Sequence, residues 1–97
     1  MTVRIAAFYK FFRFPDCSER RQALAQCFCA LGIKGTLLLA EEGVNGTIAG
    51  APDAIDAALA TLRALPGAEE LEAKFSEADT PPFPRLKVRL KREIVTM

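Results

Sequence analysis

Residues 34–50, KGTLLLAEEGVNGTIAG, constrain the fold more than any other stretch of the chain. An apolar run at residues 36–40 and a second run with β-branched residues at 44–49 flank the polar Glu41, Glu42 and Gly43. Glycine adopts positive φ without a steric penalty, and asparagine tolerates it better than other residues. Two short apolar runs around such a cluster are typical of a β-hairpin.

The turn of this hairpin has two candidate positions. A turn at Glu42-Gly43 leaves two strands of similar length, so we expect it there, with Asn45-Gly46 as a β-bulge. A turn at Asn45-Gly46 is the alternative, since both residues tolerate positive φ. The apolar pattern alone does not decide the register.

The first strand is expected at residues 3–13, where side chains alternate with a period of two and Pro15 follows. Five of the eight aromatic residues lie within residues 8–14: Phe8, Tyr9, Phe11, Phe12 and Phe14. Because large apolar side chains are usually buried, we expect the core to take the face with Val3, Ile5, Tyr9 and Phe11. Phe8 and Phe12 would then lie on the other face, against an RNA base or another domain.

Two helices and two further strands complete the pattern. The first helix is expected between a capping box at Asp16 and Glu19 and a stop at Gly32, and the second begins at Pro52. Apolar and polar residues alternate again at 70–76 and 85–91. The order βαββαβ plus one extra strand predicts an α+β, ferredoxin-like (acylphosphatase-like) sandwich. Each helix has one apolar stripe, so both should cover one sheet face and leave the opposite face open.

Composition narrows the chemistry. Ninety-seven residues make a single domain, and the absence of histidine removes His-based acid–base catalysis, Ser–His or Cys–His nucleophile pairs and most zinc sites. The odd number of cysteines (Cys17, Cys27 and Cys29) fits reduced thiols in the cytoplasm, and Cys17, near a helix start, is the candidate reactive thiol. No segment has the apolar length of a membrane span. We therefore expect a cytoplasmic domain with no metal, no cofactor of its own and no membrane contact.

The last strand carries the most informative charge pattern. Because alternate residues share a strand face, Arg85, Lys87, Arg89 and Lys91 should form a row of cations with Arg92 beside it. A phosphate backbone is the natural complement of such a row, so we take these residues as candidate RNA-binding residues. The alternative is an edge strand protected by charge, or a solvated row paired with the acidic residues at 69–72.

Other candidate sites are weaker. Glu41 and Glu42 are adjacent and point in different directions, so they make a poor acid–base pair. An acylphosphatase-type hydrolase would use this sandwich with a phosphate cradle after the first strand and an asparagine on the hairpin, for which Asn45 would stand. The segment FRFPDCSER has no glycine-rich loop to form that cradle.

Three motifs carry a family resemblance: YKF at residues 9–11, GTLLLAEEGVNGTIAG at 35–50 and PFPRLKVRLKREIVT at 82–96. Over nearly the whole chain the sequence resembles the N-terminal domain of the rhodanese-related tRNA uridine hydroxylases. The resemblance implies a bacterial enzyme that converts the wobble uridine of certain tRNAs to 5-hydroxyuridine with molecular oxygen as co-substrate. It also implies a rhodanese domain after this one, holding the essential cysteine, so we expect the full-length protein to continue past Met97.

The positions that match the family motifs lie in the hairpin and at the end of the chain: Gly35, Thr36, Ala40, Glu42, Gly43, Asn45, Gly46, Thr47, Gly50, Phe83, Arg85, Lys87, Glu93, Ile94 and Val95. We expect this domain to recognise tRNA through the basic strand, with no catalytic residue of its own. The hairpin residues Glu42, Gly43, Asn45, Gly46 and Thr47 would shape a cleft between domains. A purely structural domain that braces the rhodanese domain or a dimer through Phe8 and Phe12 is the rival hypothesis.

Overall fold

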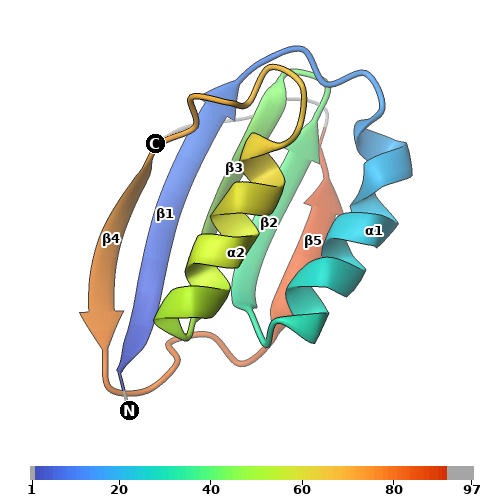
Figure 1. The fold of residues 1–97 in the computed structure, drawn as a ribbon. Coiled ribbons are helices and arrows are strands. Elements are labelled where there is room, and N and C mark those ends of the chain that lie inside the picture. The colour runs from blue at the N-terminus through green and yellow to red at the C-terminus, as the bar shows by residue number, and fades with distance from the viewer. Residues whose placement is uncertain (1, 92–97) are drawn as a thin grey trace.

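Seven elements follow one another in the computed structural model, which describes residues 2–91. They are β1 (Val3–Phe11), α1 (Cys17–Ala30), β2 (Lys34–Ala40), β3 (Gly43–Gly50), α2 (Pro52–Arg63), β4 (Ala73–Ala78) and β5 (Leu86–Leu90). Both helices lie on the same face of a five-stranded sheet (Figure 1). The predicted α+β ferredoxin-like sandwich with one open sheet face is confirmed.

The strands lie in the order β4-β1-β3-β2-β5, with β5 at one edge and β4 at the other. All neighbours are antiparallel except β5, which runs parallel to β2. The Gly35 amide donates to the Arg85 carbonyl at 3.1 Å, and the Lys91 amide donates to the Leu39 carbonyl at 2.8 Å. The extra strand therefore lengthens the sheet and places the basic row on its edge.

The core lies between the helices and the sheet. Each helix contributes one apolar stripe, as predicted, from Leu24 and Phe28 of α1 and from Ile55, Leu59 and Leu62 of α2. They pack against apolar side chains of the three central strands, among them Phe8, Leu37, Leu39, Val44 and Ile48. No helix within residues 2–91 combines the length and apolar character that crossing a bilayer would need.

Only the C-terminal end of α1 agrees with the prediction. Gly32 takes φ +74° just after the helix and its amide donates to the Cys29 carbonyl, as a C-terminal stop should. The prediction of a capping box at the N-terminal end is wrong, because the Asp16 side chain makes no cap hydrogen bond. Its carboxylate instead accepts a 2.8 Å hydrogen bond from Arg20 Nε one turn later. This contact competes directly with capping for the same oxygen atoms.

The hairpin turn lies one residue earlier than predicted. Ala40 pairs with Gly43, so Glu41 and Glu42 form the two-residue loop, and the ladder runs through Asn45 and Gly46 without a bulge. Gly43 has φ +142°, and a Cβ there would collide with the Lys10 carbonyl oxygen of β1. This glycine therefore marks the close approach of β1 to β3, while Gly46 has no positive φ.

The predicted core face of β1 is also wrong for its aromatic residues. Val3 is buried, but Tyr9 and Phe11 are 56% and 52% exposed, whereas Phe8 is 4% exposed and belongs to the core. Phe12 is partly buried and packs against that core. Alternation fixes the period of a strand but leaves open which of its two faces is buried.

Candidate nucleic-acid interface

We call the sheet side opposite the helices the open face. Cross-strand partners share a side, so the register assigns its residues strand by strand from the exposed Tyr9. Apart from its cations, the open face carries uncharged strand residues. They are Val3, Ile5, Ala7, Tyr9, Phe11, Thr36, Leu38, Ala40, Asn45, Thr47, Ala49, Ser76 and Ala78. No element within residues 2–91 covers this side (Figure 1).

The strand residues of the open face carry charge of one sign only. The register places Lys34, Lys74, Lys87 and Arg89 on it, all exposed. Among the residues of the five described strands, no Asp or Glu lies on this side, because the single strand carboxylate, Glu77, pairs with Arg4 on the helix side. A chain with a formal net charge of +1 thus gathers four cations on one surface. Such a surface attracts polyanions.

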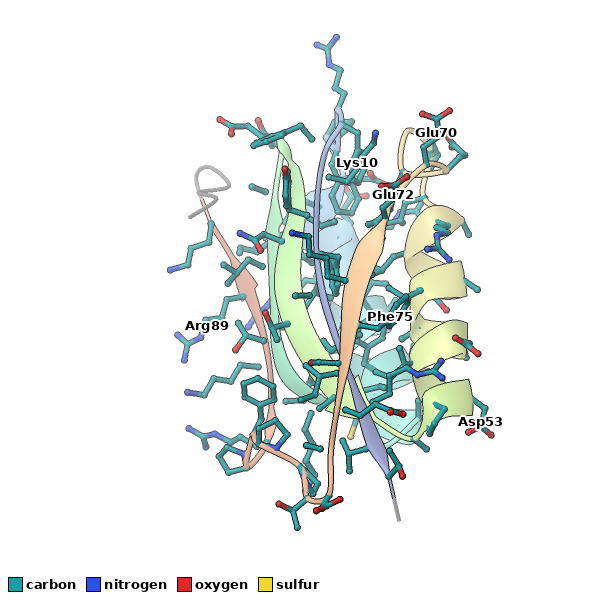
Figure 2. The ribbon with its side chains drawn as sticks, turned by 90° about the vertical axis from the view of Figure 1, so that its left-hand side faces the viewer. Lys10, Asp53, Glu70, Glu72, Phe75 and Arg89 are labelled. Carbon is teal, nitrogen blue, oxygen red and sulfur yellow. The ribbon has the colours of Figure 1, made fainter. Side chains whose placement is uncertain are left out.

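The basic row of β5 points away from the helices. Lys87 pairs with Thr36 and Arg89 with Leu38, both on the open face, and Figure 2 shows Arg89 directed away from α2. Arg85 and Lys91 flank the strand and are exposed. The fifth candidate, Arg92, lies outside the described residues.

Among the residues that the structure describes, none of these cations takes part in an ion pair. Within residues 2–91 the ion pairs are Arg4–Asp56 at 3.4 Å and Arg20–Asp16 at 2.8 Å, both involving a helix or its first turn. Residues 69–72 precede β4, at the sheet edge opposite β5, which is about 19 Å away over four strand spacings. The alternative in which the basic row pairs with this acidic run is therefore not supported among the described residues.

A shallow groove of about 1180 Å³ lies on the open face over β1, β3 and the start of β4. Tyr9 and Phe11 form its aromatic part, with ring centroids 6.0 Å apart in an edge-to-face arrangement. The polar and charged residues that line it are Lys10, Asn45, Thr47, Glu70, Glu72 and Lys74. We call this feature the aromatic groove.

The five hairpin residues predicted to shape a cleft do not form one cluster. Asn45 and Thr47 lie on the open face within the aromatic groove, and Gly46 lines it as well. Glu42 is in the exposed hairpin turn, while Gly43 is buried beside β1. Only the middle of β3 thus contributes to the groove.

The cysteines lie away from this surface. All three are in α1, and Cys17 is buried among apolar residues. Cys27 is partly buried, with its Sγ 3.9 Å from the hydroxyl oxygen of Thr61. No group of three or more potential metal ligands occurs within residues 2–91.

The segment after β1 is built unlike a phosphate cradle. The backbone amides of Phe12 and Phe14 donate to the carbonyls of Glu42 and Glu41, each at 2.9 Å. A cradle needs such amides free to point at an anion. Here they fasten the hairpin turn to the chain between β1 and α1.

Sequence analysis missed four residues of the open face: Tyr9, Phe11, Lys34 and Lys74. Tyr9 and Phe11 were missed because the alternation of β1 was assigned to the wrong face, so these two residues were expected in the core. The two lysines belong to β2 and β4, and only the sheet register shows that they share the open face with the basic row. Gly46 was the available signal, because a glycine inside a strand often marks a place where another group approaches closely.

Comparison with known proteins gives a family match over residues 3–94 to the UPF0176 acylphosphatase like domain. The chain is 56% identical over 94 residues to the tRNA uridine(34) hydroxylase of Caulobacter vibrioides (strain NA1000 / CB15N), covering 97% of this chain and 30% of that protein. It is 56% identical over 93 residues to the tRNA uridine(34) hydroxylase of Brucella ovis, covering 96% and 30%. The chain thus spans less than a third of the length of these curated relatives.

Solved structures share the fold at low sequence identity. The dark-state structure of the BLUF protein BlrB superposes with a TM-score of 0.71 at 22% identity, covering 92% of this chain and 72% of that one. An acylphosphatase from Coxiella burnetii superposes with a TM-score of 0.60 at 15% identity, covering 91% and 93%. These similarities support the architecture alone.

Proposed function

Because the chain belongs to the family of the UPF0176 acylphosphatase like domain, we propose that it is the tRNA-binding N-terminal domain of a tRNA uridine(34) hydroxylase. In this proposal the open face binds phosphates of the tRNA substrate. The relatives' names supply the substrate class, and the charge distribution supplies the role of this domain.

One observation carries the proposal: the open face holds four exposed cations and no strand carboxylate among the described residues. Phosphate contacts provide affinity and orientation without reading sequence, which suits a surface made of flexible Lys and Arg side chains. The cations lie on three strands, so they form a field across the sheet. An edge that used charge only against aggregation would need them on the edge strands β4 and β5 alone, whereas Lys34 lies on the inner strand β2.

The hydroxylation itself is assigned to the remainder of the longer protein. We expect that remainder to include a rhodanese domain with the reactive cysteine, and molecular oxygen to be the co-substrate in the cytoplasm. The positions of Cys17, Cys27 and Cys29 support this division, since α1 lies behind the sheet from the proposed tRNA surface. This domain would position tRNA for chemistry performed elsewhere.

The test replaces Arg85, Lys87, Arg89 and Lys91 with glutamine in the full-length protein and measures tRNA binding and hydroxylation. We expect weaker binding and a higher KM for tRNA. The control is the double variant Arg4→Gln/Arg20→Gln, which removes cations from the helix side. If the control weakens binding as much as the β5 variant, the open face is not the tRNA surface.

A purely structural domain is the second candidate, favoured by the exposure of Tyr9 and Phe11. The structure changes which residues could make this contact, because Phe8 is buried and cannot reach a partner. In that case replacing Tyr9 and Phe11 would separate the domains or a dimer, while the glutamine variant would still bind tRNA. Size-exclusion chromatography with light scattering distinguishes the two.

A further inference from the structure

We propose that the aromatic groove receives an unpaired base of the bound RNA, stacked on Tyr9 or Phe11. This inference rests on the proposed function, since it assumes that RNA lies on the open face. It goes further because it assigns a second mode of contact and a preference for single-stranded RNA over duplex.

The exposure of the two rings is the first support. Tyr9 and Phe11 are more than half exposed on a face where no described element covers them. Their edge-to-face contact at 6.0 Å leaves ring surface available to a flat partner. Aromatic side chains on an open sheet stack unpaired bases, because every base has a π-face.

The charges of the groove decide between a base and a phosphate. Glu70 and Glu72 line it together with Lys10 and Lys74, so the charges of its lining balance and it has no excess of cations to attract a phosphate. A base is neutral, and its N–H groups donate to carboxylates, while Thr47 and Lys74 offer donors to its carbonyl groups. Uracil carries both kinds of group, one N–H and two carbonyls. The groove is therefore better matched to a base than to the backbone that carries it.

The position of the groove relative to β5 allows one RNA strand to use both. Tyr9, Asn45, Leu38 and Arg89 form one row across the sheet. Three strand spacings separate Tyr9 from Arg89, which is about 14 Å. A strand only a few nucleotides long can span that distance with a base in the groove and its phosphates on the basic row.

Phe75 provides a matched control. It is 53% exposed, like Tyr9 and Phe11, but it pairs with Ala6 on the helix side of the sheet. Figure 2 shows its ring on the side of β4 that faces α2, and Arg4 lies 5.6 Å from the ring centroid. A substitution there changes an exposed aromatic residue without touching the groove.

The experiment compares an RNA hairpin with an unpaired loop and a fully paired duplex of equal length, using the 97-residue chain, whose core comes from its own elements. We expect Tyr9→Leu/Phe11→Leu to weaken loop binding roughly 5- to 150-fold, the range for removal of base stacking, with duplex binding unchanged. Phe75→Leu should change neither. Equal weakening for loop and duplex, or unchanged loop binding, would overturn the inference.

A second readout needs no substitution. The chain has one tyrosine and no tryptophan, so its intrinsic fluorescence reports on Tyr9 alone. We expect loop RNA to quench it and duplex RNA to leave it unchanged; quenching by both, or by neither, contradicts base stacking.

The two proposals can fail separately. If the β5 glutamine variant binds normally while the aromatic variant no longer binds the loop, the proposed phosphate-binding role of β5 is wrong and base stacking in the groove is supported. If the wild-type chain binds neither RNA, both proposals fail.

Discussion

The ring of Phe8 lies over Gly46, its cross-strand partner on β3, in the space that a side chain at residue 46 would need. A Cβ built on Gly46 would lie 2.9 Å from Phe8 Cζ and 2.6 Å from the Thr36 carbonyl oxygen. This pair fixes the phase of β1, since Phe8 in the core turns Tyr9 and Phe11 outward. The exposed aromatic residues of the open face thus follow from a glycine on the neighbouring strand.

Gly46→Ala should destabilise the fold by about 1–3 kcal/mol, the usual cost of overpacking a core. The added methyl group meets backbone as well as Phe8, so rotation of one ring cannot relieve the contact. Urea unfolding measures the change. The control is Gly50→Ala, whose Cβ would meet the flexible Ile33 Cδ1 at 3.0 Å, and we expect it to cost less. Equal costs would show that Phe8 and Gly46 do not set the packing.

Arg21→Met should loosen the β5 edge. Arg21 Nε donates to the Val88 carbonyl at 3.1 Å and ties α1 to the outer strand. Removing this bond should cost about 1 kcal/mol, typical of one such hydrogen bond. Faster amide hydrogen exchange at Lys91, whose N–H bonds Leu39, is the expected local sign. Faster exchange throughout the sheet would instead indicate global destabilisation.

Arg20→Gln should raise the pKa of Asp16. The hydrogen bond from Arg20 lowers the pKa of this carboxyl below its ordinary value of 3.8. Because the folded pKa is the lower one, the stability that this contact adds is present above pH 3.8 and disappears as the pH falls through the lowered pKa. An NMR titration of the Asp16 carboxyl carbon measures the shift. An unchanged pKa in the variant would remove Arg20 as the cause.

The isolated chain should not hydrolyse acyl phosphates, although it shares the acylphosphatase architecture. The amides of Phe12 and Phe14, which a phosphate cradle would use, are bonded to the hairpin turn. A benzoyl phosphate assay beside an active acylphosphatase tests this. Turnover that survives purification and disappears on substitution of Asn45 would contradict it.

Local patterns were sufficient to predict the element order and both helical stripes. Pro52 and Gly32 fulfil their expected roles at helix ends, because those roles depend on neighbours along the chain. The hairpin turn was misplaced because Gly43 is needed for the close approach of Lys10 on another strand, and not for the turn. Periodicity along the chain does not reveal contacts between distant segments.

The candidate site shows the same division. The β5 row was predictable, since alternation within one strand places Lys87 and Arg89 together. That Lys34 and Lys74 share its face follows only from pairings between strands. The roles of the β5 row and of the hairpin residues stay predictions, as does that of Arg92 outside the described residues.

The most direct test of the central claim is the slope of log Kd for tRNA against log salt concentration. Each neutralised phosphate adds about 0.7 to 0.9 to that slope. We predict that replacing Arg85, Lys87, Arg89 and Lys91 with glutamine flattens the slope by about 0.7 to 0.9 for every phosphate that the variant no longer neutralises, while Arg4→Gln/Arg20→Gln leaves it unchanged. A slope equal to that of the wild type in the β5 variant would contradict the claim that this face binds tRNA.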